Sequence, residues 1–172
     1  MKKSKSENHL ASSISADSCR DEFISSSPAE TEDFAAKFAK KISPGTVIAL
    51  FGELGSGKSV FARGFARGLG ITEPVQSPTF VIVHEYRIRK KSIAVKFLFH
   101  LDLYRIENAE SAFVFGMDEY LKPEAAITII EWAERIEKQL PSGTIKIRLR
   151  HVTEKQRGIL SVELQTSESA TS

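Results

Sequence analysis

The chain has 172 residues, of which 41% are hydrophobic and 27% are charged, a composition typical of a single globular domain. Its 24 Lys and Arg residues nearly balance 22 Asp and Glu residues, so the net charge of +2 gives no general attraction to nucleic acid or an anionic membrane. Its apolar runs are far shorter than the ~18 residues that span a bilayer, and Lys2 and Lys3 precede no signal-peptide core. The lone cysteine, Cys19, excludes a disulfide framework and a cysteine-based metal site. We therefore expect a cytoplasmic protein with no membrane partner.

The two ends of the chain differ in composition from its middle. Residues 1–26 are rich in Ser, Lys and small polar side chains, with too few apolar residues to offset the entropy lost on ordering the backbone. Residues 165–172 have the same character. We therefore predict a disordered Ser-rich tail over 1–26, one folded domain over 27–164 and a second disordered tail over 165–172.

The folded domain is expected to begin with a helix, because Ser27, Pro28 and Glu30 supply an N-cap, a first-turn proline and a capping-box acid. The later elements follow from apolar periodicity and turn residues. They are a strand over 46–51, a helix that ends near 68–70, a hairpin of strands over 80–88 and 93–103, a helix over 108–121, a strand over 125–130, a helix over 132–140, and strands over 144–150 and 158–164. This order predicts an α/β protein with a three-layer fold and a mixed central β-sheet.

The segment from residue 52 to residue 59 matches the phosphate-binding pattern G-x-x-x-x-G-K-[ST]. Its glycines let the backbone turn tightly and bring N–H groups close to phosphate oxygens. Lys58 is placed to reach the β- and γ-phosphates at the start of a helix, and the hydroxyl of Ser59 can bind Mg²⁺. The loop, called a P-loop, lies between a predicted strand and a predicted helix, as the motif requires. The predicted fold is therefore P-loop NTPase-like, with three layers and a mixed central β-sheet. The residues expected to bind ATP and Mg²⁺ here are Gly52, Glu53, Leu54, Gly55, Ser56, Gly57, Lys58 and Ser59.

Two carboxylates are candidates to complete this site. Asp102 ends an apolar run at 97–101, and Glu131 follows the apolar run at 125–130. Each lies at the carboxyl end of a predicted strand, where α/β proteins bind their ligands. A P-loop enzyme needs one carboxylate for the metal and a group that positions the attacking nucleophile. The alternative for either residue is an acid in a solvated turn, and the sequence leaves open which of the two orients the water.

Three further features have both a functional and a structural interpretation. Ser77 and Thr79 lie where other P-loop proteins keep a switch segment ordered by γ-phosphate and metal, although alone they would form an ordinary turn. His100 is interpreted as a strand histidine bonded to a neighbour rather than a metal ligand, because no second His or Cys stands at ligand spacing. A basic stripe on one strand face is either solvated or a contact surface for RNA or a partner. Its members are Lys146, Arg148 and Arg150.

Four segments, in this order, carry a resemblance to a known family. They are GELGSGKS (52–59), SPTF (77–80), HLDLYR (100–105) and IEWAER (130–135). Together they resemble the TsaE family, also called YjeE, of small bacterial ATPases in tRNA threonylcarbamoyladenosine synthesis, and the similarity runs from about Pro28 to Leu164. The resemblance implies two partners, TsaB and TsaD, which modify the adenosine at position 37 of tRNAs reading ANN codons. In that family TsaD carries the transfer chemistry, tRNA is reached through the complex, and ATP hydrolysis permits repeated cycles.

The resemblance also implies roles for individual residues. Lys58, Asp102 and Glu131 are the expected catalytic residues, with Asp102 as the acid needed for hydrolysis. Ser59 and Glu131 are the expected metal ligands. Outside the loop, Trp132 and Arg157 are expected near ATP, Glu30 or Thr31 near the adenine, and Ser77 and Thr79 in the switch segment.

The chain departs from the usual family pattern at three positions. Glu53 stands where Asp is common and Ser59 where Thr is common, and both changes preserve the functional group. Ala133 replaces a frequent Pro, so the turn after Trp132 could be looser.

Two other functions compete with this interpretation. A small P-loop kinase would need an acceptor pocket and a lid carrying arginines, for which a core of this length has little room. A binding module would hold ATP as a structural ligand without hydrolysing it, and the carboxylates Asp102 and Glu131 argue against that function.

Overall fold

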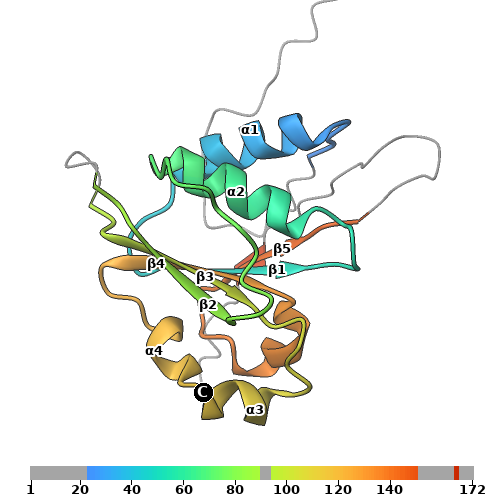
Figure 1. The fold of residues 1–172 in the computed structure, drawn as a ribbon, viewed down its shortest axis with the longest axis vertical. Coiled ribbons are helices and arrows are strands. Elements are labelled where there is room, and N and C mark those ends of the chain that lie inside the picture. The colour runs from blue at the N-terminus through green and yellow to red at the C-terminus, as the bar shows by residue number, and fades with distance from the viewer. Residues whose placement is uncertain (1–22, 90–93, 151–164, 167–172) are drawn as a thin grey trace, which may run out of the picture.

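A mixed sheet forms the centre of the computed structural model, which describes residues 23–89, 94–150 and 165–166. Its strands are β1 (Val47–Phe51), β2 (Val83–Arg87), β3 (Phe97–Asp102), β4 (Ala126–Glu131), β5 (Ile145–Arg148) and β6 (Gln165–Thr166). They lie in the order β2-β3-β4-β1-β5-β6 (Figure 1). The four inner strands run parallel, whereas β2 and β6 pair antiparallel at the edges. The predicted mixed sheet and the predicted hairpin are both confirmed.

Helices cover both faces of this sheet (Figure 1). On one face lie α1 (Pro28–Ala39) and α2 (Lys58–Gly68), with α2 between α1 and the strands. On the other lie α3 (Ala109–Val114), α4 (Met117–Leu121) and the 3₁₀ helix η1 (Ala133–Gln139). The predicted three-layer α/β fold is therefore confirmed. No helix in the described ranges combines the length and the apolar composition that a bilayer span requires.

The central strands are buried on both faces because their side chains alternate between two cores. In β1, Ile48 and Leu50 pack in the core under α1 and α2. Val47, Ala49 and Phe51 pack in the opposite core with residues of α3, α4 and η1. A strand that is apolar on both faces appears in the sequence as a continuous apolar run, which is why β1 and β4 were recognisable there.

Helix α1 contacts α2 at very short range. A Cβ added to Gly64 would lie 2.4 Å from the carbonyl oxygen of Glu32, and one added to Gly68 would lie 2.4 Å from that of Ala36. Two glycines one helical turn apart therefore let the backbones of α1 and α2 approach. Aromatic rings from both helices fill the space beside this contact: Phe34, Phe38, Phe61 and Phe65.

The predicted helix over 108–121 is wrong as a single element. The chain forms α3, turns at Phe115 and Gly116, and then forms α4. Gly116 has a φ of 80°, a left-handed conformation that interrupts an α-helix and that glycine adopts without steric cost. The predicted helix over 132–140 is the 3₁₀ helix η1, and Ile136 inside it has non-helical angles. Both segments bury apolar residues against the sheet. The spacing of apolar residues therefore predicted the buried positions correctly, although neither segment is one regular α-helix.

The C-terminal end of the chain carries two predictions, a strand over 158–164 and a disordered tail over 165–172. The strand expected over 158–164 lies outside the described residues. Strand β6 (Gln165–Thr166) pairs antiparallel with Ile145 and Lys146 of β5, in a segment that the sequence assigned to the C-terminal tail. The sheet thus continues past residue 164.

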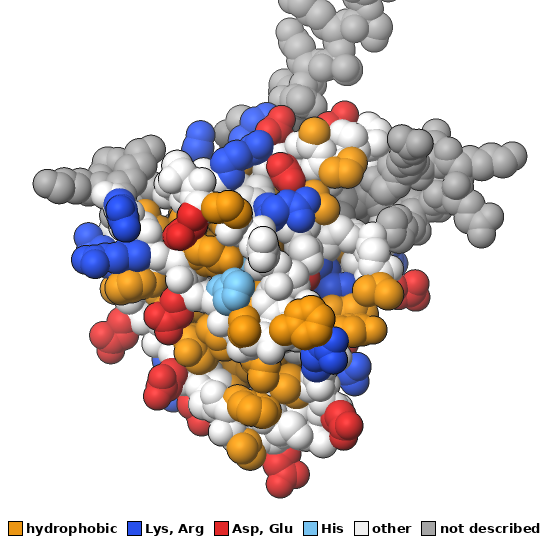
Figure 2. All heavy atoms as spheres, viewed as in Figure 1, with side chains coloured by type: hydrophobic (Ala, Val, Ile, Leu, Met, Phe, Trp, Pro, Cys, Tyr) orange, Lys and Arg blue, Asp and Glu red, His pale blue; other side chains and the backbone are white. Residues whose placement is uncertain are grey.

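The surface reflects the near balance of charges. Figure 2 shows Lys, Arg, Asp and Glu side chains distributed around the rim of one face, with hydrophobic atoms across its middle. Phe80 and Val81, which precede β2, are exposed at 84% and 57%. The guanidinium of Arg105 lies 4.5 Å from the centre of the Phe80 ring.

Candidate nucleotide-binding site

The glycine-rich loop joins the carboxyl end of β1 to the first turn of α2, as predicted. Gly52 opens it with a φ of 144°. A Cβ at this position would lie 2.4 Å from the carbonyl oxygen of Leu149 and 2.7 Å from the hydroxyl of Ser56. The loop therefore passes so close to the segment after β5 that a side chain at Gly52 would displace it.

Lys58, the first residue of α2, is buried and directs its ammonium group into the loop. Its Nζ donates to the carbonyl oxygens of Gly52 at 2.5 Å and Glu53 at 2.8 Å, and lies 3.9 Å from the centre of the Trp132 ring. Burial lowers the pKa of Lys58, whereas three nearby carboxylates favour its charged form. These are, in order of effect, Glu134, Glu131 and Asp102.

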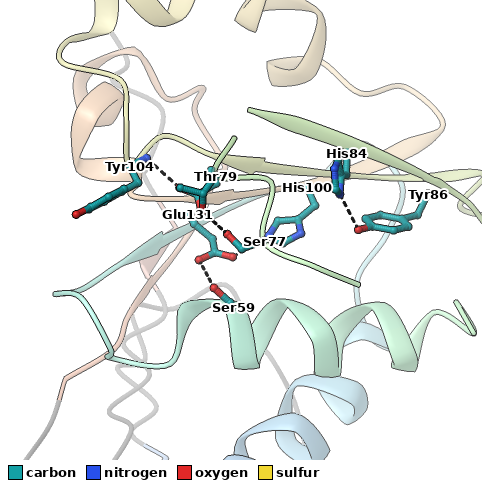
Figure 3. Close-up of polar contacts among 9 residues, drawn as sticks. Ser59, Ser77, Thr79, His84, Tyr86, His100, Tyr104 and Glu131 are labelled. Carbon is teal, nitrogen blue, oxygen red and sulfur yellow. Dashed lines mark hydrogen bonds and ion pairs between the residues drawn. The ribbon is translucent and has the colours of Figure 1, made fainter. Parts of the chain in front are cut away.

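Glu131, the last residue of β4, is held at both carboxylate oxygens. The hydroxyl of Ser59 donates to Oε2 at 2.8 Å, and Nε2 of His100 lies 2.7 Å from Oε1. Figure 3 shows Glu131 pointing from the sheet toward Ser59 on α2, with His100 beside it. Both Glu131 and His100 are almost completely buried, at 2% and 1% exposed. The expected pair of metal ligands, Ser59 and Glu131, is therefore brought into direct contact.

Asp102, the last residue of β3, has a different set of partners. The hydroxyls of Ser77 and Thr79 both donate to its Oδ2, that of Thr79 at 2.6 Å. The backbone N–H of Tyr104 donates to its other oxygen, Oδ1, at 2.9 Å. Ser77 and Thr79 lie in the irregular segment between α2 and β2. The sequence motif SPTF is thus attached to one of the two predicted carboxylates.

One open cleft of about 400 Å³ contains the residues predicted to bind phosphate and metal and the acid Asp102. The loop and the first turn of α2 form one wall, and the ends of β3 and β4 form another. The rings of Tyr104 and Trp132, 5.0 Å apart, close one side. Trp132 has a φ of 59°, a left-handed conformation that is rare outside glycine and that turns the chain sharply after Glu131. The cleft residues are Leu54, Gly55, Ser56, Gly57, Lys58, Ser59, Val60, Ser77, Thr79, Asp102, Tyr104, Glu131 and Trp132.

The oxygen atoms at this cleft fit a magnesium ion. Mg²⁺ prefers hard oxygen ligands and usually takes one or two from the protein, with water and substrate phosphates supplying the others. Ser59 and Glu131 present a hydroxyl and a carboxylate oxygen 2.8 Å apart. The described residues contain no cluster of three or more His, Cys, Asp and Glu side chains, so a complete metal cage built by protein alone is not found among them.

Two residues expected near adenine are not brought to the cleft. Glu30 accepts hydrogen bonds from the N–H and the hydroxyl of Ser26, both at 2.8 Å, which lower the pKa of Glu30. Thr31 is buried, and its hydroxyl donates to that of Ser25 at 2.9 Å. Both residues therefore act at the start of α1 in this structure. Arg157, which was expected to approach ATP, lies outside the described residues.

The basic stripe on β5 is engaged within the protein. Lys146 and Arg148 form ion pairs with Glu137 of η1 at 3.1 and 3.3 Å. The guanidinium of Arg148 also lies 4.7 Å from the centre of the Phe51 ring. Two of the three stripe residues are therefore paired within the protein, which neither predicted alternative, a solvated face or a contact with RNA or a partner, anticipated.

Sequence reasoning missed Tyr104 and undervalued His100. Tyr104 lies in the HLDLYR segment, two residues after Asp102, and that proximity was the available signal. His100 was correctly assigned to a strand and to a bond with a neighbour, but the neighbour was not identified. Because side chains alternate along a strand, His100 and Asp102 share a face, and a parallel pairing of β3 with β4 places Glu131 on that face as well.

The chain is similar to known proteins in sequence and in fold. Residues 25–159 match the family model described as "Threonylcarbamoyl adenosine biosynthesis protein TsaE". A Bacillus subtilis protein named "tRNA threonylcarbamoyladenosine biosynthesis protein TsaE" is 40% identical over 132 residues, which cover 77% of this chain and 78% of the relative. A Treponema pallidum protein of the same name is 34% identical over 79% of this chain and 96% of its own length. The crystal structure of Bacillus subtilis YdiB superposes with a TM-score of 0.67 at 33% identity, covering 86% of this chain and 87% of YdiB.

Proposed function

The chain belongs to the TsaE family, and on that premise we propose that it is an ATP-hydrolysing accessory subunit for forming threonylcarbamoyladenosine at position 37 of tRNAs reading ANN codons. Relatives that share most of its length are named for this pathway. The observation that carries the ATPase proposal is the meeting of Lys58, Ser59, Asp102 and Glu131 in one cleft. These are the phosphate, metal and acid groups that phosphoryl transfer to water requires.

The proposed roles follow from the surroundings of each side chain. Lys58 would exchange the loop carbonyls for the β- and γ-phosphates, which bind a buried ammonium more strongly because they are charged. Ser59 and Glu131 would hold Mg²⁺, which neutralises charge on the phosphates. Asp102 would accept a hydrogen bond from the attacking water, with Ser77 and Thr79 as the switch segment that reports the γ-phosphate.

The adenine end of the site is assigned by resemblance. We propose that Trp132 lies against the nucleotide, because its ring lines the cleft beside Lys58. By the same resemblance, Arg157 is proposed to approach ATP, and Glu30 or Thr31 to lie near the adenine. Glu30 and Thr31 would need the start of α1 to rearrange, since their present partners are Ser26 and Ser25.

The proposed partners are TsaB and TsaD, and TsaD is proposed to carry the transfer chemistry. This division of labour is what the resemblance to the TsaE family implies. The tRNA would be reached through the complex, in the cytoplasm. The ATPase of the isolated chain is proposed to be weak.

One experiment separates this function from a kinase and from a non-hydrolysing binding module. Phosphate release is measured for the chain alone, for the chain with TsaB, TsaD and tRNA, and for the chain with a panel of small hydroxyl acceptors. We expect slow release alone and faster release with the partners. Transfer of phosphate to a small acceptor would establish a kinase, and bound ATP that is never hydrolysed under any condition would establish a binding module.

Lys58→Ala provides an internal control for the site itself. Removing a buried charge aimed at the phosphates is expected to lower turnover by roughly 100- to 1,000-fold. Unchanged turnover in this variant would show that hydrolysis occurs elsewhere or comes from a contaminant.

A further inference from the structure

His100 makes one hydrogen bond within the described part of the chain, and that bond is to the proposed metal ligand. The ring is 1% exposed, its Nε2 lies 2.7 Å from Oε1 of Glu131, and its Nδ1 has no partner among the described residues. A carboxylate that binds Mg²⁺ is ionised and only accepts hydrogen bonds, so in that state Nε2 carries a proton and donates a hydrogen bond to Glu131. The polar function of this buried ring is therefore directed at Glu131.

The position of His100 in the sheet explains how it reaches Glu131. In the β3–β4 pair, Asp102 is opposite Glu131 and His100 is opposite Ile129, so His100 approaches Glu131 diagonally from one pleat further inside. His100 does not line the cleft, whereas Asp102 and Glu131 do. His100 lies beside Glu131 (Figure 3), and only Glu131 of the two reaches the cleft.

Burying a histidine ring at this depth costs more free energy than burying an aliphatic side chain, because a buried polar atom without a partner loses its hydrogen bonds to water. The same face of β3 carries Leu98 one pleat deeper, packed in the α1/α2 core, and an aliphatic residue at position 100 would leave no buried nitrogen without a partner. The bond to Glu131 is the one polar contact of this ring among the described residues, and an aliphatic residue could not make it. Outer hydrogen-bond partners of metal ligands hold the ligand in one orientation.

We propose that His100 is a positioning residue for the metal site: it holds Oε1 of Glu131 so that Oε2 remains beside the Ser59 hydroxyl, where Mg²⁺ would bind with the nucleotide. The inference rests on the proposed function and adds a residue that does not touch the metal, the nucleotide or the water. Without the donor, Glu131 could rotate away from Ser59, and the metal would lose a fixed ligand while the loop and Lys58 remained intact.

The test measures metal affinity directly. Mn²⁺ is used as the probe, and its binding to the full chain in the presence of a non-hydrolysable ATP analogue is followed by electron paramagnetic resonance. Nucleotide affinity without metal is measured separately in EDTA. For His100→Leu we expect Mn²⁺ affinity to fall about 10- to 100-fold, and metal-free nucleotide affinity to change by less than about twofold.

A matched pair of variants separates the hydrogen bond from the packing. The amide nitrogen of Gln can occupy the position of Nε2 of histidine and donate to Glu131. The side chain of Asn is shorter, so its amide nitrogen lies near the position of Nδ1 and does not reach Glu131. His100→Gln should therefore keep most of the Mn²⁺ affinity, and His100→Asn should lose it. This pair carries the test if His100→Leu does not fold.

His84→Leu is the control for a histidine on the same face of the sheet. His84 lies directly opposite His100 on β2 and contacts the hydroxyl of Tyr86 at 3.1 Å, outside the cleft. The Mn²⁺ affinity of the His84→Leu variant should equal that of the unmodified protein.

The outcomes distinguish this inference from the proposed function. If the unmodified chain shows no nucleotide-dependent Mn²⁺ binding, the proposed function fails and the inference fails with it. If the unmodified chain binds Mn²⁺ and the Asn and Gln variants at His100 match each other, either with full affinity or with equal loss, the inference alone is overturned. Recovery in His100→Gln but not in His100→Asn supports it.

Discussion

Glu131 and Asp102 end adjacent parallel strands, lie opposite each other in the sheet and are equally buried, yet they are held in different ways. The partners of Glu131 are Ser59, in the first turn of α2, and His100, inside β3. Both partners belong to regular secondary structure whose apolar side chains are buried in the core. The side-chain partners of Asp102 are Ser77 and Thr79, which belong to a segment without regular structure.

This difference indicates which carboxylate suits which task. A metal ligand must keep one geometry, and supports on helices and strands hold it more precisely than supports on loops. A group that engages water only when the γ-phosphate is present needs partners that can be exchanged, and loop hydroxyls provide them. The structure thus favours Glu131 for the metal and Asp102 for hydrolysis, a choice that the two strand ends alone left open.

The strongest test of the comparison is Asp102→Asn. Asn keeps the size of the side chain but is a much weaker acceptor for the proton of the attacking water, so we expect turnover with TsaB, TsaD and tRNA to fall about 100- to 10,000-fold. ATP affinity should stay within about twofold. Single-turnover phosphate release and direct nucleotide binding measure the two quantities, and a loss of ATP binding would reassign Asp102 to a structural role.

Glu131→Gln should have the opposite signature. The carbonyl oxygen of Gln can still accept from His100, but the negative charge at the Ser59 side is lost. We expect the half-saturating Mg²⁺ concentration for nucleotide binding to rise about 100-fold, the upper end of the range for disturbed metal sites. Nucleotide affinity in EDTA should not fall. If Glu131→Gln and Asp102→Asn give the same pattern, the division of tasks between the two carboxylates is wrong.

Thr79→Val tests the exchangeable partners of Asp102. Valine preserves the shape of threonine but removes the hydroxyl that donates to Oδ2. A hydrogen bond to a charged group contributes about 1.5–3 kcal/mol, so we expect turnover to fall about 10- to 100-fold and Mg²⁺ affinity to remain unchanged. In a double-mutant cycle, Thr79→Val should add little to Asp102→Asn, whereas it should add its full effect to Glu131→Gln.

Gly64→Ala tests whether both carboxylates depend on the packing of α1 against α2. The new methyl group would lie 2.4 Å from the carbonyl oxygen of Glu32 and would force the helices apart. We expect the free energy of unfolding to fall by about 1–3 kcal/mol, as for other overpacked contacts. Turnover and metal affinity of the folded protein should be unaffected, and chemical denaturation with a parallel activity assay separates the two. A change in turnover equal to that of Thr79→Val would mean that α1 acts on the site.

Much of this molecule follows from local features of the chain. Ser27 accepts from the N–H of Glu30 as an N-cap, and α1 begins at Pro28 as its sequence indicated. The β1 strand, the loop and α2 were predictable because an apolar run, a glycine pattern and a helical stripe follow each other without a gap. Residues 108–121 were less tractable, since an apolar pattern reports which side chains are buried and does not report a turn such as the one at Gly116.

Some features of the candidate site also follow from local sequence, whereas others depend on the tertiary structure. By itself, the sequence determined that Lys58 and Ser59 lie in a phosphate loop, because their spacing within eight consecutive residues defines the backbone geometry. It also placed Asp102 and Glu131 at strand ends. Tertiary structure alone decided that Ser59 meets Glu131 across 72 positions of the chain, that Ser77 and Thr79 bind Asp102, and that His100 lies beside Glu131. The physical reason is that these contacts depend on which strands are neighbours and in what register, and strand order is a property of the whole fold, which no local segment encodes.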